Sequence, residues 1–101
     1  MSSSAITKSA LCDSLKKLCE QKPFDKISIS DITGECGLNR QSFYYHFQDK
    51  YELLSYIYLH ELFADITKGV NYDNWYERLE GFLVNMLKDK RFYSNTLKSN
   101  E

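Results

Sequence analysis

Apolar residues recur at helical spacing through almost the whole of this chain, and few residues interrupt the pattern. Leu11, Leu15 and Leu18 stand at positions i, i+4 and i+7, a spacing that places them on one face of an α-helix. The 101 residues include one proline and four glycines, which is few for the many turns of an all-β fold. The pattern therefore predicts one all-helical domain of ordinary size.

Helix-boundary signals divide the chain into successive helices. Pro23 ends the first, because the residue before a proline disfavours helical geometry. Ser28, Asn39 and Asp49 are N-cap candidates for the next three helices, and Gly37 stands where a helix end commonly needs a positive φ. The expected helices span about residues 4–21, 29–36, 40–47, 50–68, 74–87 and 92–97.

The second and third expected helices are short and are joined by about three residues that include Gly37. This arrangement is a helix-turn-helix pattern. On the third helix, Phe43 and Phe47 are four residues apart and form its buried edge. The exposed N-terminal end is then left to Arg40 and Gln41, whose side chains can bond the edges of guanine and adenine in a major groove.

Polar side chains near the third helix are of the kinds that bind phosphate oxygens. Ser42, Tyr44, Tyr45 and His46 offer hydroxyl or ring N–H donors,. Lys50 stands in the first turn of the fourth helix, where its charge opposes the helix dipole unless the helix end and the lysine hold an anion together. The combination predicts a domain that binds double-stranded DNA.

These residues carry a resemblance to a known family. The run Phe-Tyr-x-His-Phe-x-x-Lys-x-x-Leu, from Phe43 to Leu53, follows the segments 27–32 and 36–38 and is typical of the N-terminal DNA-binding domain of TetR-type transcriptional regulators. The chain resembles that domain over about residues 5–66. The segments 24–28, 40–44 and 47–50 more narrowly resemble the branch that includes activators of dihydroxyacetone kinase operons.

The resemblance implies a homodimer that binds a pseudo-palindromic operator through the third helix of each subunit. It implies base contacts from Arg40 and Gln41, and a DNA contact from Ser30 on the second helix. The residues expected to contact the DNA backbone are Ser42, Tyr44, Tyr45, His46 and Lys50. A small-molecule effector or a co-activator protein is a possible further partner, since the co-inducer of that branch can act through a partner protein.

The family pattern divides the chain into a helix-turn-helix domain over residues 1–50 and, over residues 51–101, a connecting helix with the beginning of an incomplete effector and dimerisation domain. Thr33 and Cys36 stand where the family usually has alanine, so the two short helices are expected to pack slightly less closely. The last two expected helices have wide apolar faces. These faces either remain uncovered until a partner or a further domain covers them, or fold back on the first and fourth helices.

Composition and motifs exclude several other classes of protein. The net charge of −1 gives no global support to nucleic-acid binding, so that prediction depends on local placement,. Cys12, Cys19 and Cys36 have no Cys-x-x-Cys spacing and are expected to be reduced thiols in a cytoplasmic protein, with no metal or other cofactor,. Neither a membrane span nor a secretory signal is expected.

Two rival functions remain. His46 and His60 are the only histidines, and the chain has no motif of a hydrolase, a metalloprotease or a phosphate-binding loop, so an enzyme is not expected. The alternative function is a helical protein–protein interaction module that uses a tyrosine-rich face of the later helices. The aromatic residues of that face are Tyr51, Tyr56, Tyr58, Tyr72, Trp75 and Tyr76.

Overall fold

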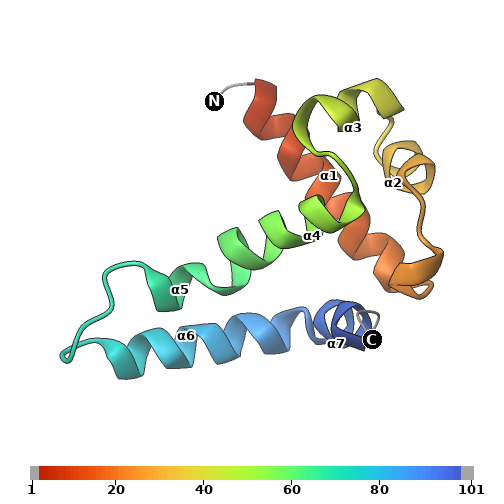
Figure 1. Ribbon diagram of the computed structural model, residues 1–101. Helices are drawn as coiled ribbons and strands as arrows, with labels where there is room; N and C mark the ends of the chain where they lie inside the picture. Colours follow the sequence, from red (N-terminus) through yellow and green to blue (C-terminus); the bar gives the residue numbers. More distant parts are fainter. Residues whose placement is uncertain (1–2, 99–101) are drawn as a thin grey trace.

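The computed structural model describes residues 3–98, and every regular element in that range is helical (Figure 1). The prediction of an all-helical fold is thus confirmed. In chain order the elements are α1 (Ser3–Cys19), the 3-10 turn η1 (Phe24–Lys26), α2 (Ile29–Glu35), α3 (Arg40–His46), α4 (Lys50–Ile57), the π-helical turn η2 (Tyr58–Leu62), α5 (Ala64–Thr67), α6 (Trp75–Lys88) and α7 (Lys90–Lys98).

The three short helices begin where the sequence predicts, because a side chain binds a free amide at each start. Ser28 and Asp31 form a reciprocal capping box, in which each side chain accepts a hydrogen bond of 3.0 Å from the other residue's N–H,. The side chain of Asn39 accepts from an amide in the first turn of α3 at 2.8 Å. Asp49 does the same for α4 at 2.9 Å,.

Glycines with positive φ end two of the predicted helical segments. Gly37 follows α2 with a φ of +73°, and Gly69 follows α5 with a φ of +64°,. After Gly37, the N–H of Leu38 donates to the carbonyl of Thr33 at 2.9 Å, and Leu38 packs against the core. This is the fold-back contact expected of a glycine-terminated helix.

The single long helix expected over 50–68 is instead divided into α4, η2 and α5. The N–H of Phe63 donates to the carbonyl of Tyr58, five residues earlier, at 2.9 Å, which is the hydrogen bond of a π-helical turn. Ile57 and Leu62 are both buried although they are five residues apart. On a regular α-helix they would stand about 140° apart, so the wider turn brings both side chains to the core.

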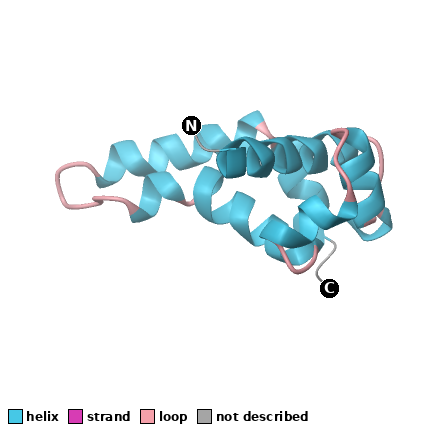
Figure 2. Cartoon of the chain, turned by 90° about the horizontal axis from the view of Figure 1, so that it is seen from above, coloured by secondary structure: helices cyan, strands magenta, loops and turns pink. Residues whose placement is uncertain are grey.

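One hydrophobic core runs through both halves of the chain, with α1 at its centre. Leu11 and Leu15 of α1 are fully buried, together with Ile32 of α2, Phe43 of α3 and, at the other end of the chain, Phe92 of α7. The hairpin of α5 and α6 extends to one side of this cluster, as Figures 1 and 2 show from two directions. The molecule is accordingly elongated, at 45 × 32 × 20 Å.

The last two helices, α6 and α7, are buried to different extents. Helix α7 folds back on α1 and η2, with Phe92 and Tyr93 buried and the hydroxyl groups of Tyr58 and Thr96 bonded at 2.5 Å. Helix α6 contains no buried residue. Both helices therefore fold back, α7 on α1 and α6 on α5 and η2, which are parts of the expected fourth helix, although Leu83 and Leu87 of α6 stay exposed.

Asn95 of α7 closes the end of α1 through three hydrogen bonds. Its amide nitrogen donates to the carbonyls of Cys19 and Lys22, each at 3.0 Å, and its amide oxygen accepts from the N–H of Phe24 at 3.0 Å. These backbone groups belong to the link that follows α1, and the cap holds that link against the last helix.

Replacing Asn95 by alanine is expected to lower the free energy of unfolding by about 1–3 kcal/mol, because the backbone groups it binds lose their partners. Urea titration followed by circular dichroism measures the change. The matched control is Ser94→Ala at the exposed neighbouring position of α7, which should alter the stability by less than about 0.5 kcal/mol. Equal effects of the two substitutions would contradict the capping role.

Candidate nucleic-acid interface

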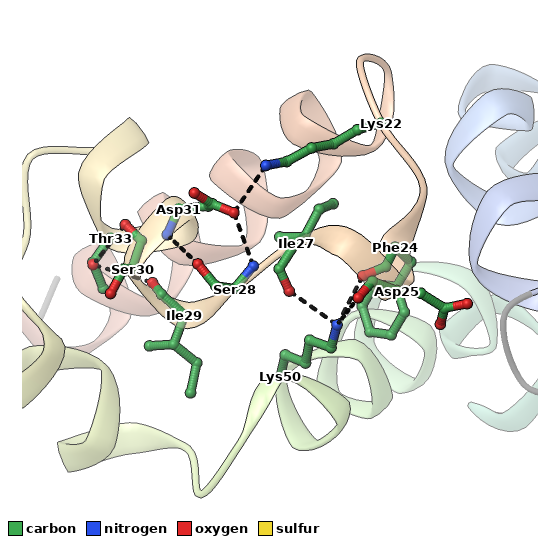
Figure 3. Close-up of polar contacts among 10 residues, drawn as sticks. All are labelled: Lys22, Phe24, Asp25, Ile27, Ser28, Ile29, Ser30, Asp31, Thr33 and Lys50. Carbon is green, nitrogen blue, oxygen red and sulfur yellow. Dashed lines mark hydrogen bonds and ion pairs between the residues drawn. The ribbon is translucent and has the colours of Figure 1, made fainter.

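Helix α2 is attached to α1 by a short polar contact inside the core. The hydroxyl of Ser14, on α1, donates to the carbonyl of Ile32 at 2.5 Å, and both residues are buried. At the start of α2, the ammonium of Lys22 binds the carboxylate of Asp31 at 2.9 Å (Figure 3). These two contacts hold α2, the first helix of the helix-turn-helix pair, in position.

Helix α3 divides its residues between the core and the solvent. Phe43 and Phe47 are buried with their ring centroids 5.9 Å apart, as the spacing predicts. Arg40, Gln41 and Tyr45 are exposed, and the side chain of Tyr45 is 83% exposed. A large aromatic side chain this open to solvent on a rigid helix is suited to contact another molecule.

The exposed residues of α3 are partly arranged by one another. The guanidinium of Arg40 lies over the ring of Tyr44 at 5.9 Å from the centroid and donates to its hydroxyl at 3.4 Å. The two residues are one helical turn apart. This contact supports Arg40 at the N-terminal end of α3 and leaves it exposed.

A shallow hollow of about 260 Å³ lies beside α3. Its lining brings together Gln41, Ser42, Tyr45 and His46 with Asn39 and, from the N-terminal end of α1, Thr7. Thr7 is not among the residues that the sequence predicts for this surface. The available signal was its place one turn before the buried Leu11 on α1, because a residue at i−4 shares a helix face with that core residue.

Lys50, for which the resemblance implies a phosphate contact, lies beside the η1 link. Its ammonium donates to the carbonyls of Phe24 at 2.8 Å and Ile27 at 2.9 Å, and more weakly to that of Asp25 at 3.4 Å (Figure 3). The ammonium also lies 4.5 Å from the centroid of the Phe24 ring,. Lys50 therefore holds the η1 link between α1 and α2, and its three N–H donors are engaged there.

The electrostatics of Lys50 agree with this inward position. Burial lowers the pKa of its ammonium, and the nearby carboxylate of Asp25 partly offsets that effect,. The sequence could not indicate this position, since Lys50 and Phe24 are 26 residues apart.

Ser30 is exposed on α2. Thr33 of α2 is buried, and its hydroxyl donates to the carbonyls of Ile29 at 3.1 Å and Ser30 at 3.3 Å. Its polar group is thus satisfied within α2, as buried hydroxyl groups require.

The cysteines do not form a second candidate site. Burial raises the pKa of the Cys12 thiol to about 12 and that of Cys19 to about 11, so both remain protonated and poorly nucleophilic. Over the part of the chain that the structure describes, no three His, Cys, Asp or Glu residues come together as metal ligands. Over the same part, no helix is long and apolar enough to cross a membrane.

Comparison with known proteins identifies the same region. Residues 11–57 match the family model described as bacterial regulatory proteins, tetR family. The chain is 31% identical over 93 residues to the HTH-type dhaKLM operon transcriptional activator DhaS of Lactococcus lactis, covering 92% of this chain and 50% of that protein. It is 31% identical over 84 residues to the transposon Tn10 TetC protein of Escherichia coli, covering 80% of this chain and 43% of that protein.

A solved structure has the same fold. The dihydroxyacetone kinase operon activator DhaS superposes with a TM-score of 0.81 at 28% identity, over 95% of this chain and 54% of that one. The chain thus spans about half the length of the relatives it matches.

The capping carboxylate of Asp31 makes the stability of this region dependent on pH. The backbone N–H of Ser28, and then Lys22, hold its pKa at about 2, below the ordinary value of 3.8. A lowered pKa in the folded state contributes stability above about pH 4, which is lost as the pH falls towards 2.

We expect Asp31→Asn to lower the melting temperature at pH 6 and to flatten the decline of the melting temperature between pH 4 and pH 2,. Thermal unfolding at a series of pH values measures both effects. Asp13→Asn, at an exposed position of α1, should retain the decline of the unsubstituted chain. An undiminished acid decline in Asp31→Asn would contradict the assignment.

Lys50→Met retains an unbranched side chain but removes the three N–H donors, so the carbonyls of Phe24 and Ile27 lose their partner. We expect a loss of about 1–3 kcal/mol in the free energy of unfolding, measured by urea titration. Lys26→Met, at an exposed lysine of the same η1 turn, should change it by less than about 0.5 kcal/mol. A Lys50→Met variant as stable as this control would refute the structural role of the ammonium.

Proposed function

Because residues 11–57 are a helix-turn-helix domain of the tetR family of bacterial regulatory proteins, we propose that this chain recognises a specific sequence in double-stranded DNA. In this proposal it acts as a dimer on a pseudo-palindromic operator. The family is one of transcriptional regulators, and DhaS is a transcriptional activator, so the chain is a regulator rather than an enzyme.

The observation that carries the proposal is that one face of α3 is exposed to solvent while its opposite face is held in the core. Arg40 and Gln41 stand exposed at the N-terminal end of α3, while Phe43 and Phe47 anchor its other face in the core. Arginine forms paired hydrogen bonds with guanine, and glutamine with adenine, in a major groove. We therefore assign base recognition to Arg40 and Gln41.

The surrounding polar residues supply the contacts to the DNA backbone in this proposal. Ser42, Tyr45 and His46 line one hollow with Thr7, and Tyr44 is held against Arg40. We assign phosphate contacts to the donors of α3, namely Ser42, Tyr44, Tyr45 and His46, with a further contact from Ser30 of α2. Lys50 remains a proposed backbone contact as well, since its bond to the carbonyl of Asp25 is long, at 3.4 Å, and exposed.

Regulation belongs to the second half of the chain in this proposal. Residues 1–50 form the DNA-binding domain, and residues 51–101 form a connecting helix and the beginning of an effector and dimerisation domain. Half-sites would lie about one helical turn apart, roughly 34–36 Å. A small-molecule effector or a co-activator protein would change the distance between the DNA-binding domains of the two subunits. In this proposal the protein acts in the cytoplasm. The similarity to DhaS favours control of a metabolic operon.

The alternative function, an interaction module with one tyrosine-rich face, is not favoured. Tyr58 is half-buried and bonded to Thr96, and Tyr56 stacks on His60 with ring centroids 4.1 Å apart. Tyr72, by contrast, is almost fully exposed in the loop before α6. The aromatic residues thus belong to separate environments and do not form a single face.

Selection of bound duplexes from a random library tests the function. The chain should enrich a pseudo-palindrome, and Arg40→Ala should lose the preference at one base pair of each half-site, a change of about 1–3 kcal/mol, or roughly 5- to 150-fold. Arg91→Ala, at an exposed arginine of α7, is the matched control and should enrich the same sequence. The proposal fails if no sequence is enriched, or if Arg40→Ala retains every base preference.

A further inference from the structure

An open groove of about 950 Å³ lies between the end of α1 and helix α7. Residues 19–25, where α1 ends and η1 follows, form one wall, and the end of α6 with one side of α7 forms the other. Asn95 lines the groove and joins the two walls, because its amide nitrogen binds the carbonyls of Cys19 and Lys22. The groove is thus preformed, and its volume lies in the range of about 300–1,000 Å³ that is usual for small-molecule sites.

The wall formed by α6 and α7 is strongly basic. Four basic side chains of this wall line the groove: Lys88, Lys90, Arg91 and Lys98. All four are exposed, and none of them forms an ion pair with any side chain that the structure describes. Asp89, the one carboxylate among residues 88–98, binds Lys16 instead. Positive charge therefore accumulates here although the whole chain has a net charge of −1,.

The opposite wall does not neutralise this charge. Its own cation, Lys22, binds Asp31 at 2.9 Å. Glu20 and Asp25 line the groove and are exposed, and over the described part of the chain neither forms an ion pair across it. The lining thus contains five basic residues and two acidic ones, and the groove attracts anions.

The groove is separate from the proposed DNA interface. Thr7, near the start of α1, lines the hollow beside α3, whereas Cys19, at the end of α1, lines the groove. These two residues are about 18 Å apart along the helix at 1.5 Å for each residue. In Figure 1, α3 accordingly lies near the start of α1 and α7 lies near its end. A ligand of the groove would not compete with a duplex for the side chains of α3.

We propose that this groove binds a small organic phosphate. A phosphate monoester carries nearly two negative charges at neutral pH, which suits several unpaired cations better than the single charge of a carboxylate. The guanidinium of Arg91 can bond two phosphate oxygens at once, and the lysines add point charges. Pro23 and Leu87 are exposed in the same groove and offer apolar contacts to the organic part of the ligand,.

This inference goes beyond the proposed function and is tested without DNA. Phenyl phosphate is the probe, titrated into the isotope-labelled chain in about 150 mM NaCl and followed by two-dimensional NMR. It should shift the amide signals of residues 19–25 and 87–98, with a dissociation constant below about 1 mM. Inorganic phosphate lacks the apolar part and benzoate carries a single charge, so each should bind severalfold more weakly.

Substitutions on both walls test the charges. Arg91→Ala and Lys98→Ala should each raise the dissociation constant for phenyl phosphate about three- to tenfold. Lys26→Ala is the matched control, since Lys26 is an exposed lysine of η1 that does not line the groove, and it should change the constant by less than about twofold. Glu20→Gln should lower the constant, because it removes a carboxylate from the lining,.

Four results would overturn the proposal. They are an absence of binding at about 5 mM phenyl phosphate, equal affinity for benzoate, a dissociation constant that Arg91→Ala and Lys98→Ala leave unchanged, and amide shifts that lie on α3 instead of the groove. The last result would assign the phosphate to the DNA interface. A chain that binds phenyl phosphate in the groove but enriches no duplex refutes the proposed function alone, and the reverse outcome refutes this inference alone.

Discussion

Burial of the apolar side of α1 is the interaction on which the other elements of this molecule depend. Leu11 and Leu15 are completely buried, and the side chains that cover them come from the helix-turn-helix pair, from α4 and from α7. At about 25 cal/mol for each Å² of apolar surface, one fully buried leucine contributes roughly 1.5–3 kcal/mol. Since both halves of the chain share this core, α1 joins the helix-turn-helix pair, α2 and α3, to the helices that follow it.

Polar contacts determine the relative positions of the helices more exactly than apolar packing does. Burial orders α2 against α1, but the bond from Ser14 to the carbonyl of Ile32 selects one position along the helix. Lys16 links α1 to Glu61 in η2 and to Asp89 after α6, so one ammonium spans three elements. Burial alone would lower the pKa of Lys16, but its bonds to Glu61 and then Asp89 outweigh that effect and raise it. The ammonium therefore stays charged at neutral pH.

The arrangement separates two surfaces with different chemistry. The side of α3 that carries Arg40, Gln41 and Tyr45 is polar and exposed, as contact with a charged duplex requires,. Helix α6, by contrast, exposes apolar side chains such as Leu83 and Leu87 to solvent.

Sequence alone determined the features that depend on neighbours a few residues apart. The starts of α2, α3 and α4 were predictable because each capping side chain binds an amide three residues away,. The helix-turn-helix and the exposed position of Arg40 followed for the same reason, since periodicity alone places Phe43 inward. The family resemblance added the expected roles of these residues.

Tertiary structure decided the features that join distant parts of the chain. The carbonyls that bind Lys50 lie as many as 26 residues before it, and the amide that Asn95 binds lies 71 residues before it. The π-helical turn at η2 allows Ile57 and Leu62 to bury together, and Thr7 meets α3 only because α1 passes beside it. Local pattern does not encode these contacts, because their free energy is gained only when separate helices pack together and satisfy one another's polar groups.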